Sequence, residues 1–162
     1  MGSAISVPAP SASVIQDPDV STALHQLADA WTTQSNGELR MSCVEGSVLD
    51  ALGALNVQEA RLSLLASGEA LSWLAWAGAS GGAHGRRRGN ALGRDAAWWT
   101  NAALTEKTFH WPLNNEELET AVNSLQWFWW DTNEPTTGWQ LQLCIHHADR
   151  NRSWAISVHD WK

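Results

Sequence analysis

The chain has 162 residues, of which 44% are hydrophobic and 17% charged, and this composition supports one folded domain and excludes a wholly disordered chain. Its net charge of −7 argues against binding of nucleic acid or anionic membranes by the whole surface, and two cysteines exclude a disulfide scaffold. The aromatic residues are unusual, with 12 Trp, 2 Phe and no Tyr.

The N-terminal part of the sequence predicts a tail followed by a helix and a strand. Residues 1–18 are rich in Ser, Ala and Pro and lack the basic and apolar regions of a secretory signal, so we expect a flexible tail. A single α+β domain is then expected over residues 19–162. A helix is predicted from Asp19, because apolar residues recur after it at helical spacing (Val20, Leu24, Leu27 and Trp31). The alternation over Leu39–Val44 predicts a strand.

Three further helix starts are predicted in the next part of the chain. Ser47, Asn56 and Ser67 are each followed by an acidic or apolar segment that suits the first turn of a helix. The segment Ala70–Ala79 is apolar on nearly all sides, which predicts a central, buried helix. Its uncharged stretch extends only to Gly85, short of the roughly 20 residues that a bilayer span needs, so no membrane partner is expected.

The segment from residue 80 to residue 94 has the most unusual composition. Four of the chain's ten basic residues lie within nine positions here, so the remainder of the chain carries a net charge of −11. The small residues recur every four positions, which favours a helix whose smooth stripe lets another helix approach closely. The stripe consists of Gly81, Gly85, Gly89, Gly93 and Ala97.

A glycine-rich loop that receives phosphate on its amides and guanidinium groups is the alternative for this segment. Neither standard phosphate-binding fingerprint is present in it. On a helix, the consecutive Arg86, Arg87 and Arg88 would spread over about 200°, so at most two of them could hold one anion. We expect the inward-facing ones to meet acidic residues of the same chain (Glu116, Glu117, Glu119 or Asp131).

A later helix is predicted to start at Asn114, with a buried face that extends from Leu118 to Trp129. The run Trp127–Trp130 would then cover a full helical turn, so at least one indole must face another element, solvent or a partner. Core filling with one interface residue is the main interpretation, and a stacking platform for bases or sugars is the alternative.

The C-terminal part predicts a β-hairpin. The alternating runs Trp139–His147 and Arg152–His159 flank a turn, and the register that places Leu141 opposite Val158 makes one face apolar and the other polar. Leu39–Val44 is expected to pair with this hairpin as a third strand. The expected fold class is α+β, with several helices packed on one face of a small antiparallel sheet that ends in the C-terminal β-hairpin.

The residues with catalytic or metal-binding chemistry give a weak signal. His146 and His159 share the polar face of the hairpin but lie near 20 Å apart in this register, which is too far for one metal ion. Cys144 and His146 are neighbours on that face, so a thiolate–imidazole pair is conceivable, although a buried thiol is the commoner situation. We therefore predict no metal, no cofactor and two free, buried cysteines.

A series of short motifs resembles a known family. These motifs are AHGRRRG at residues 83–89, AAWW at 96–99, WWD at 129–131 and EP at 134–135. They resemble a family of uncharacterised actinobacterial proteins that is classed as a domain of unknown function, over about residues 20 to 160. The resemblance implies a bacterial cytosolic protein but transfers no activity, cofactor or catalytic residue. The excess of Arg over Lys is consistent with that origin.

Three functions are predicted, in order of preference. The first is a non-catalytic, cytoplasmic module that binds another protein, or a second copy of itself, through a surface rich in Trp and Arg. The second is a binder of a phosphorylated ligand or nucleic acid at residues 81–94. The third is an enzyme that uses Cys144 or a histidine. The candidate binding residues are His84, Arg86, Arg87, Arg88, Arg94, Trp127 and Trp130.

Overall fold

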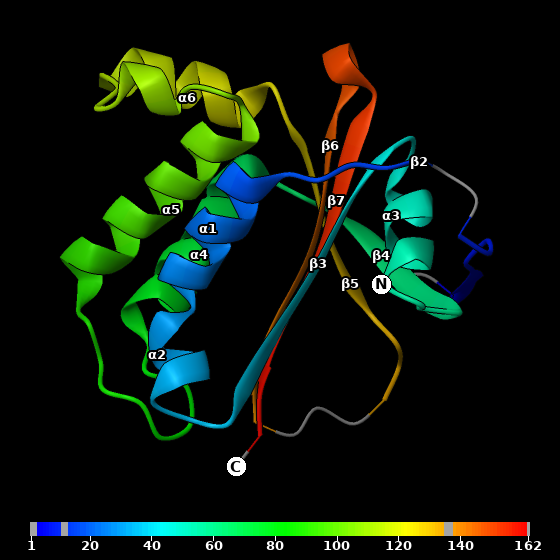
Figure 1. Ribbon diagram of the computed structural model, residues 1–162, viewed down its shortest axis with the longest axis horizontal. Coiled ribbons are helices and arrows are strands. Elements are labelled where there is room, and N and C mark those ends of the chain that lie inside the picture. Colours follow the sequence, from blue (N-terminus) through cyan, green and yellow to red (C-terminus); the bar gives the residue numbers. More distant parts are fainter. Residues whose placement is uncertain (1–2, 11–12, 135–137, 162) are drawn as a thin grey trace.

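The computed structural model describes residues 3–10, 13–134 and 138–161 and confirms the α+β fold (Figure 1). Its strands form one antiparallel sheet in the order β1-β4-β5-β6-β7-β3-β2. The strands are β1 (Ile5–Ser6), β2 (Ser13–Val14), β3 (Gly37–Glu45), β4 (Glu59–Leu65), β5 (Gln126–Asp131), β6 (Trp139–His147) and β7 (Arg152–Asp160). The helices are α1 (Pro18–Leu27), α2 (Asp29–Thr33), α3 (Val48–Ala54), α4 (Ser67–Ala79), α5 (Asn90–Leu104) and α6 (Asn115–Asn123).

The C-terminal hairpin has the predicted register. Leu141 lies opposite Val158, Leu143 opposite Ile156 and Ile145 opposite Trp154 in the β6–β7 pair. Strand β3 pairs with β7 along its whole length, which confirms the third strand. The apolar face of these strands packs against α1, α4 and α5 in the largest core cluster, where Trp31, Trp127 and Trp154 are fully buried.

The helices lie on both faces of the sheet, which differs from the expected single layer. In Figure 1, α1, α2, α4, α5 and α6 lie on one side and α3 lies on the other. Helix α3 begins with the predicted capping box of Ser47 and Asp50, and its apolar residues cover Cys144 and Ala155 on the sheet. Because α3 has only 7 residues, it covers one end of that face and leaves the other end open.

The aromatic run at residues 126–131 is strand β5, so the prediction that the helix continues to Trp129 is wrong. Helix α6 ends at Asn123, and β5 pairs with β4 on one side and β6 on the other. Its side chains alternate between the two faces, with Trp127 and Trp129 packed in the core with α4 and Trp130 packed with α3. A run of bulky aromatic residues suits a strand that is buried on both faces.

The predicted helix start at Asn56 is also wrong. Asn56 has a φ of 63° and follows the end of α3, so it terminates that helix in the left-handed conformation that asparagine tolerates. The next element is strand β4. At the other end of the chain, the first 18 residues contribute β1 and β2 to opposite edges of the sheet, and Asp17 caps α1. No helix in the described ranges has the length and apolar character that spanning a membrane requires.

Helices α4 and α5 approach each other unusually closely. A β-carbon added at Gly78 would lie 3.1 Å from the Cα of Gly93, and one added at Gly93 would overlap the carbonyl oxygen of Ala75. The small-residue contact predicted from the glycine spacing is therefore present at Gly93 and Ala97. It does not include residues 81–89, because α5 begins only at Asn90.

Candidate functional site

The segment 81–89 is a loop between α4 and α5, so the prediction of a continuous helix through the glycine stripe is wrong here. Gly82 and Gly89 have φ values of 68° and 92°, a conformation that glycine adopts without strain and that a helix does not contain. The alternative prediction, a glycine-rich loop, describes the backbone correctly. Whether the loop can receive phosphate depends on where its amide groups point.

Most amides of this loop are already hydrogen-bonded within the protein. Asp160 is fully buried at the end of β7, and its carboxylate accepts from the amide of Ala83 at 2.5 Å and from the hydroxyl of Ser35 at 3.0 Å. The amide of His84 donates to the Ser35 hydroxyl, and the amide of Arg86 donates to the side chain of Gln34. The amides of Gly85 and Arg88 donate to the carbonyls of Gly81 and Ala79, respectively. The loop is therefore held rigidly, and these amides do not form a cradle for an anion.

A groove of about 760 Å³ lies where α4, this loop and the start of α5 meet. One wall is the indole of Trp76, which is 44% exposed and packs edge-on against Trp31 at 5.4 Å between ring centroids. Arg87 from the loop and Arg94 from α5 also line it. We name it the Trp–Arg groove, and its remaining lining consists of Ser72, Ala75, Ala79, Ser80, Gly89 and Asn90.

The two arginines of the Trp–Arg groove lack an anionic partner. Among the described residues, no carboxylate lies within 4.0 Å of Arg87 or Arg94, and neither side chain makes a hydrogen bond there. Both cations lie near the N-terminus of α5, the positive end of the helix dipole, where a positive charge is unfavourable. The fold therefore carries two unneutralised positive charges at a place that does not favour its stability.

The other predicted binding residues lie elsewhere. Arg88 donates to the carbonyl oxygens of Gln26 at 2.7 Å and Leu27 at 3.1 Å, at the end of α1, so it has a structural role. His84 and Arg86 are exposed but do not line the groove. The expected pairing of the arginines with Asp131 is wrong, because Asp131 binds Arg61 through two hydrogen bonds of 2.7 and 2.8 Å. That contact lowers the pKa of Asp131.

Trp127 and Trp130 are 1% and 3% exposed, so neither indole is available to a partner. Trp127 donates its ring N–H to the carbonyl of Val122, and Trp130 donates to the carbonyls of Leu143 and Ile156. Sequence reasoning missed Trp76 instead, because it treated α4 as buried on all sides. The available signal was that the neighbours of Trp76 on this face of α4 are Ser72, Ala75 and Ala79, whose small side chains cannot cover its indole.

The structure gives no support to a reactive cysteine. Cys144 is fully buried, and burial raises the pKa of its thiol, while burial also raises the pKa of Cys43 to about 12. Both cysteines are free, as predicted. His146 contacts the hydroxyl of Ser153 at 2.7 Å through Nδ1, but Ser153 is buried and donates to the carbonyl of Gly46. This pair is therefore a structural hydrogen-bond chain.

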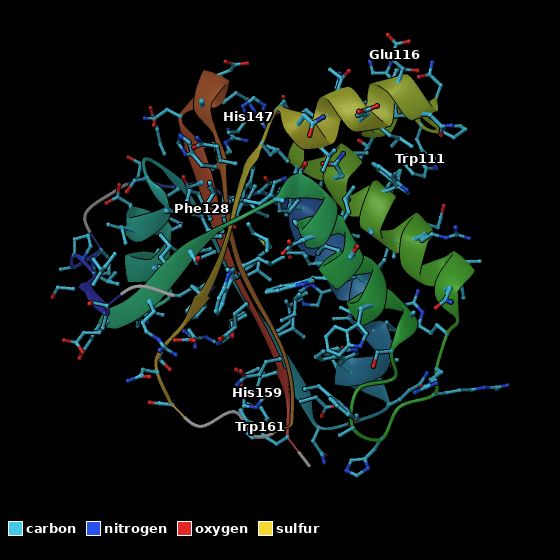
Figure 2. All side chains as sticks on the ribbon, turned by 180° about the vertical axis from the view of Figure 1, so that it is seen from behind. Trp111, Glu116, Phe128, His147, His159 and Trp161 are labelled. Carbon is cyan, nitrogen blue, oxygen red and sulfur yellow. The ribbon has the colours of Figure 1, made fainter. Side chains whose placement is uncertain are left out.

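The histidines of the hairpin do not form a metal site. Figure 2 shows His147 and His159 at opposite ends of the β6–β7 pair. Across the described ranges, no three His, Cys, Asp or Glu side chains are grouped as a metal ion would require.

Comparison with known proteins finds a match to a family model. A family model described as a family of unknown function (DUF6183) matches residues 3–161, which is nearly the whole chain. No curated protein and no solved structure matches the chain. One residue of the motif series, Pro135, lies outside the described residues, whereas the AHGRRRG motif lies within the loop that borders the Trp–Arg groove.

Proposed function

This chain belongs to the DUF6183 family of unknown function, and we propose that it is a non-catalytic module that binds an acidic segment of a partner protein in the Trp–Arg groove. The observation that carries the proposal is the pair of unneutralised cations, Arg87 and Arg94, beside the half-exposed indole of Trp76. Tryptophan and arginine are the residues that most often dominate the energy of protein–protein interfaces.

The rigidity of the loop supports this proposal. The amides of Ala83, His84 and Arg86 are held by Asp160, Ser35 and Gln34, so the backbone that carries Arg87 is ordered before any partner arrives. A partner then has to immobilise mainly the two arginine side chains, which lowers the entropic cost of binding. The acidic remainder of the chain repels an acidic segment elsewhere and directs it to this groove.

A phosphorylated ligand is the second candidate, and one observation favours it. Helix α5 begins at Asn90 without a side-chain cap, so its first amides are free to bind an anion together with Arg87 and Arg94. Against it stand the loop amides that are already bonded within the protein. We rank it below the acidic protein segment for that reason, and nucleic acid lower still because the chain has a net charge of −7.

We further propose that the module works in the bacterial cytoplasm. Two free, buried thiols are in keeping with a reducing compartment, where disulfides do not persist.

The test is binding of a synthetic acidic peptide that contains Glu, Asp and Leu, measured by calorimetry at low and at physiological salt. We expect saturable binding that falls at least 10-fold in the Arg87→Glu/Arg94→Glu variant and at least 10-fold in Trp76→Ala. Arg86→Glu is the matched control, because this exposed arginine carries the same charge and lies outside the groove. It should change affinity less than about 3-fold.

Two outcomes would overturn the proposal. If Arg86→Glu weakens the peptide as much as the groove variants do, the attraction is a general charge effect. If the peptide does not bind while inorganic phosphate or a nucleoside monophosphate raises the melting temperature, the second candidate replaces the first. Pull-down from a bacterial lysate with the unchanged chain and the three variants provides a natural partner. Its retention should fall in both groove variants and stay nearly unchanged in Arg86→Glu.

A further inference from the structure

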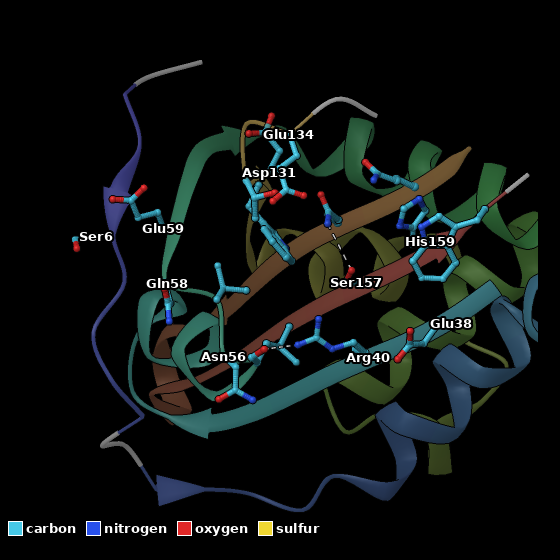
Figure 3. Close-up of a pocket in the computed structure, with 17 residues that line it drawn as sticks. Ser6, Glu38, Arg40, Asn56, Gln58, Glu59, Asp131, Glu134, Ser157 and His159 are labelled. Atoms are coloured by element: carbon cyan, nitrogen blue, oxygen red, sulfur yellow. Dashed lines mark hydrogen bonds between the residues drawn. The ribbon is translucent and has the colours of Figure 1, made fainter. Parts of the chain in front are cut away.

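A second groove lies on the opposite side of the sheet from the Trp–Arg groove. It has a volume of about 860 Å³ and occupies the half of the sheet face that α3 leaves open (Figure 3). Its floor consists of polar side chains from two central strands: Gln140 and Gln142 from β6, and Ser157 and His159 from β7. We name it the sheet groove. Its volume is within the range of small-molecule sites.

The floor of the sheet groove has hydrogen-bonding capacity that the protein does not use. Ser157 is only 8% exposed, and it accepts from the amide of Gln142 at 3.5 Å, the contact drawn in Figure 3. Within the described ranges, its hydroxyl proton has no acceptor, and the side chain of Gln140 has no hydrogen-bond partner. A buried hydroxyl with an unfilled donor is expensive unless water or a ligand completes it.

The rim of the sheet groove is acidic. Glu38, Glu59 and Glu134 are exposed there, and no cation of the described residues lies within ion-pair distance of any of them. Figure 3 shows Glu38 at one end of the groove and Glu59 and Glu134 at the other. The one arginine that lines it, Arg40, donates to the carbonyl of Leu55. A hydrogen bond to a carbonyl leaves Arg40 positively charged, so the three glutamates outnumber one arginine, and the groove presents a net negative rim around a hydrogen-bonding floor.

An aromatic pair closes one end of the sheet groove. Trp161 is 42% exposed and stacks on His159, with 4.1 Å between ring centroids and 37° between ring planes. An exposed indole face attracts cations and the C–H faces of sugar rings. The aromatic end thus suits the same positively charged ligand as the rim.

We propose that the sheet groove binds a small ligand with two or more ammonium groups, of the polyamine or amino-sugar class. Ammonium groups are placed by the rim glutamates, the amide oxygens of Gln140 and Gln142 accept from donors along the ligand, and the hydroxyl of Ser157 donates to a ligand hydroxyl where the ligand carries one. Because Glu38 lies at one end of the groove and Glu59 and Glu134 lie at the other, a ligand with charges at both ends meets more of the rim than a simple monoamine does. This site is independent of the Trp–Arg groove, and either proposal can fail alone.

The experiment is calorimetric titration of the full chain with spermidine and, separately, with the free-amine glucosamine dimer at low salt. The N,N′-diacetylated dimer has the same rings without the positive charges and serves as the uncharged ligand control. We expect one equivalent of either spermidine or the glucosamine dimer to bind, and the acetylated dimer to bind at least 10-fold more weakly. Whichever of the two amines binds more tightly identifies the ligand class.

Variants locate the site. Glu38→Gln/Glu134→Gln should weaken binding of the amine at least 10-fold, because both exposed glutamates line the groove. Ser157→Ala should weaken binding by about 3-fold or more for a ligand that places a hydrogen-bond acceptor on the floor of the groove. Glu116→Gln is the matched control, since Figure 2 shows Glu116 on α6 at the end of the molecule away from His159 and Trp161. Equal weakening by Glu116→Gln, or no binding of either amine, would overturn the proposal.

Discussion

The substitution Gly93→Ala tests whether α4 and α5 pack backbone against backbone beside the Trp–Arg groove. The added β-carbon would overlap the carbonyl oxygen of Ala75 and lie 2.8 Å from the Cβ and 2.9 Å from the amide nitrogen of Ala79. Alanine is favoured over glycine inside a helix by about 1 kcal/mol. Overpacking costs about 1–3 kcal/mol, and we place this site at the upper end because backbone atoms of α4 must move. The expected net loss in the free energy of unfolding is about 2 kcal/mol.

Urea and thermal denaturation measure this loss directly. For a chain of this size, 1 kcal/mol changes the melting temperature by about 2–4 °C, so Gly93→Ala should melt roughly 4–8 °C lower. The matched control is Gly68→Ala in the first turn of α4, where a β-carbon would meet nothing within 4 Å. That variant should be unchanged or slightly stabilised. If both variants are equally stable, the helices are not in backbone contact, and the placement of Arg94 opposite Trp76 is wrong.

Three further results are expected. Asp160→Ala should lower the free energy of unfolding by about 2 kcal/mol and speed hydrogen exchange at Ala83, because three part-buried donors lose their buried acceptor; unchanged exchange would refute the anchoring role. Burial lowers the pKa of His147, so its contribution to stability is present above its ordinary pKa and is lost as the pH falls through the lower pKa of the folded state. His147→Gln should flatten the dependence of stability on pH below the ordinary histidine pKa of about 6.5, and an unaltered slope would show that other groups cause this dependence. Cys43 and Cys144 should resist a thiol reagent in the native protein and react in denaturant, whereas rapid native labelling would show that the thiols are accessible.

The hairpin could be predicted from sequence because its information is local and redundant. Every inward residue of Trp139–His147 faces an inward residue of Arg152–Asp160, so a shift by one position would expose both apolar faces at once. Leu39–Val44 has the same alternation and extends the apolar face at the β7 edge of the hairpin, while β5 pairs with the β6 edge. Such segments are determined by their own side chains.

Strand β5 and the end of α3 could not be predicted in this way. The aromatic run at 127–130 fits the period of a helix and that of a strand equally well. It forms a strand because β5 is buried between β4 and β6, with a core cluster on each face. Asn56 is a residue type that both begins and ends helices, and its φ of 63° depends on the chain turning into β4. In both cases the information lies in distant segments.

The glycine–arginine segment shows why part of the candidate site was visible in the sequence and part was not. The cations were evident from composition, but the indole beside them depends on α5 covering one side of α4 and leaving Trp76 uncovered. The loop glycines were expected to serve a ligand or a helix, and they serve neither, since the amides bond to Asp160, Ser35 and Gln34. A loop fixed in this way presents charge without presenting backbone donors. It should therefore distinguish ligands by the spacing of their negative charges, and acidic peptides of different charge spacing should bind Arg87 and Arg94 with different affinities.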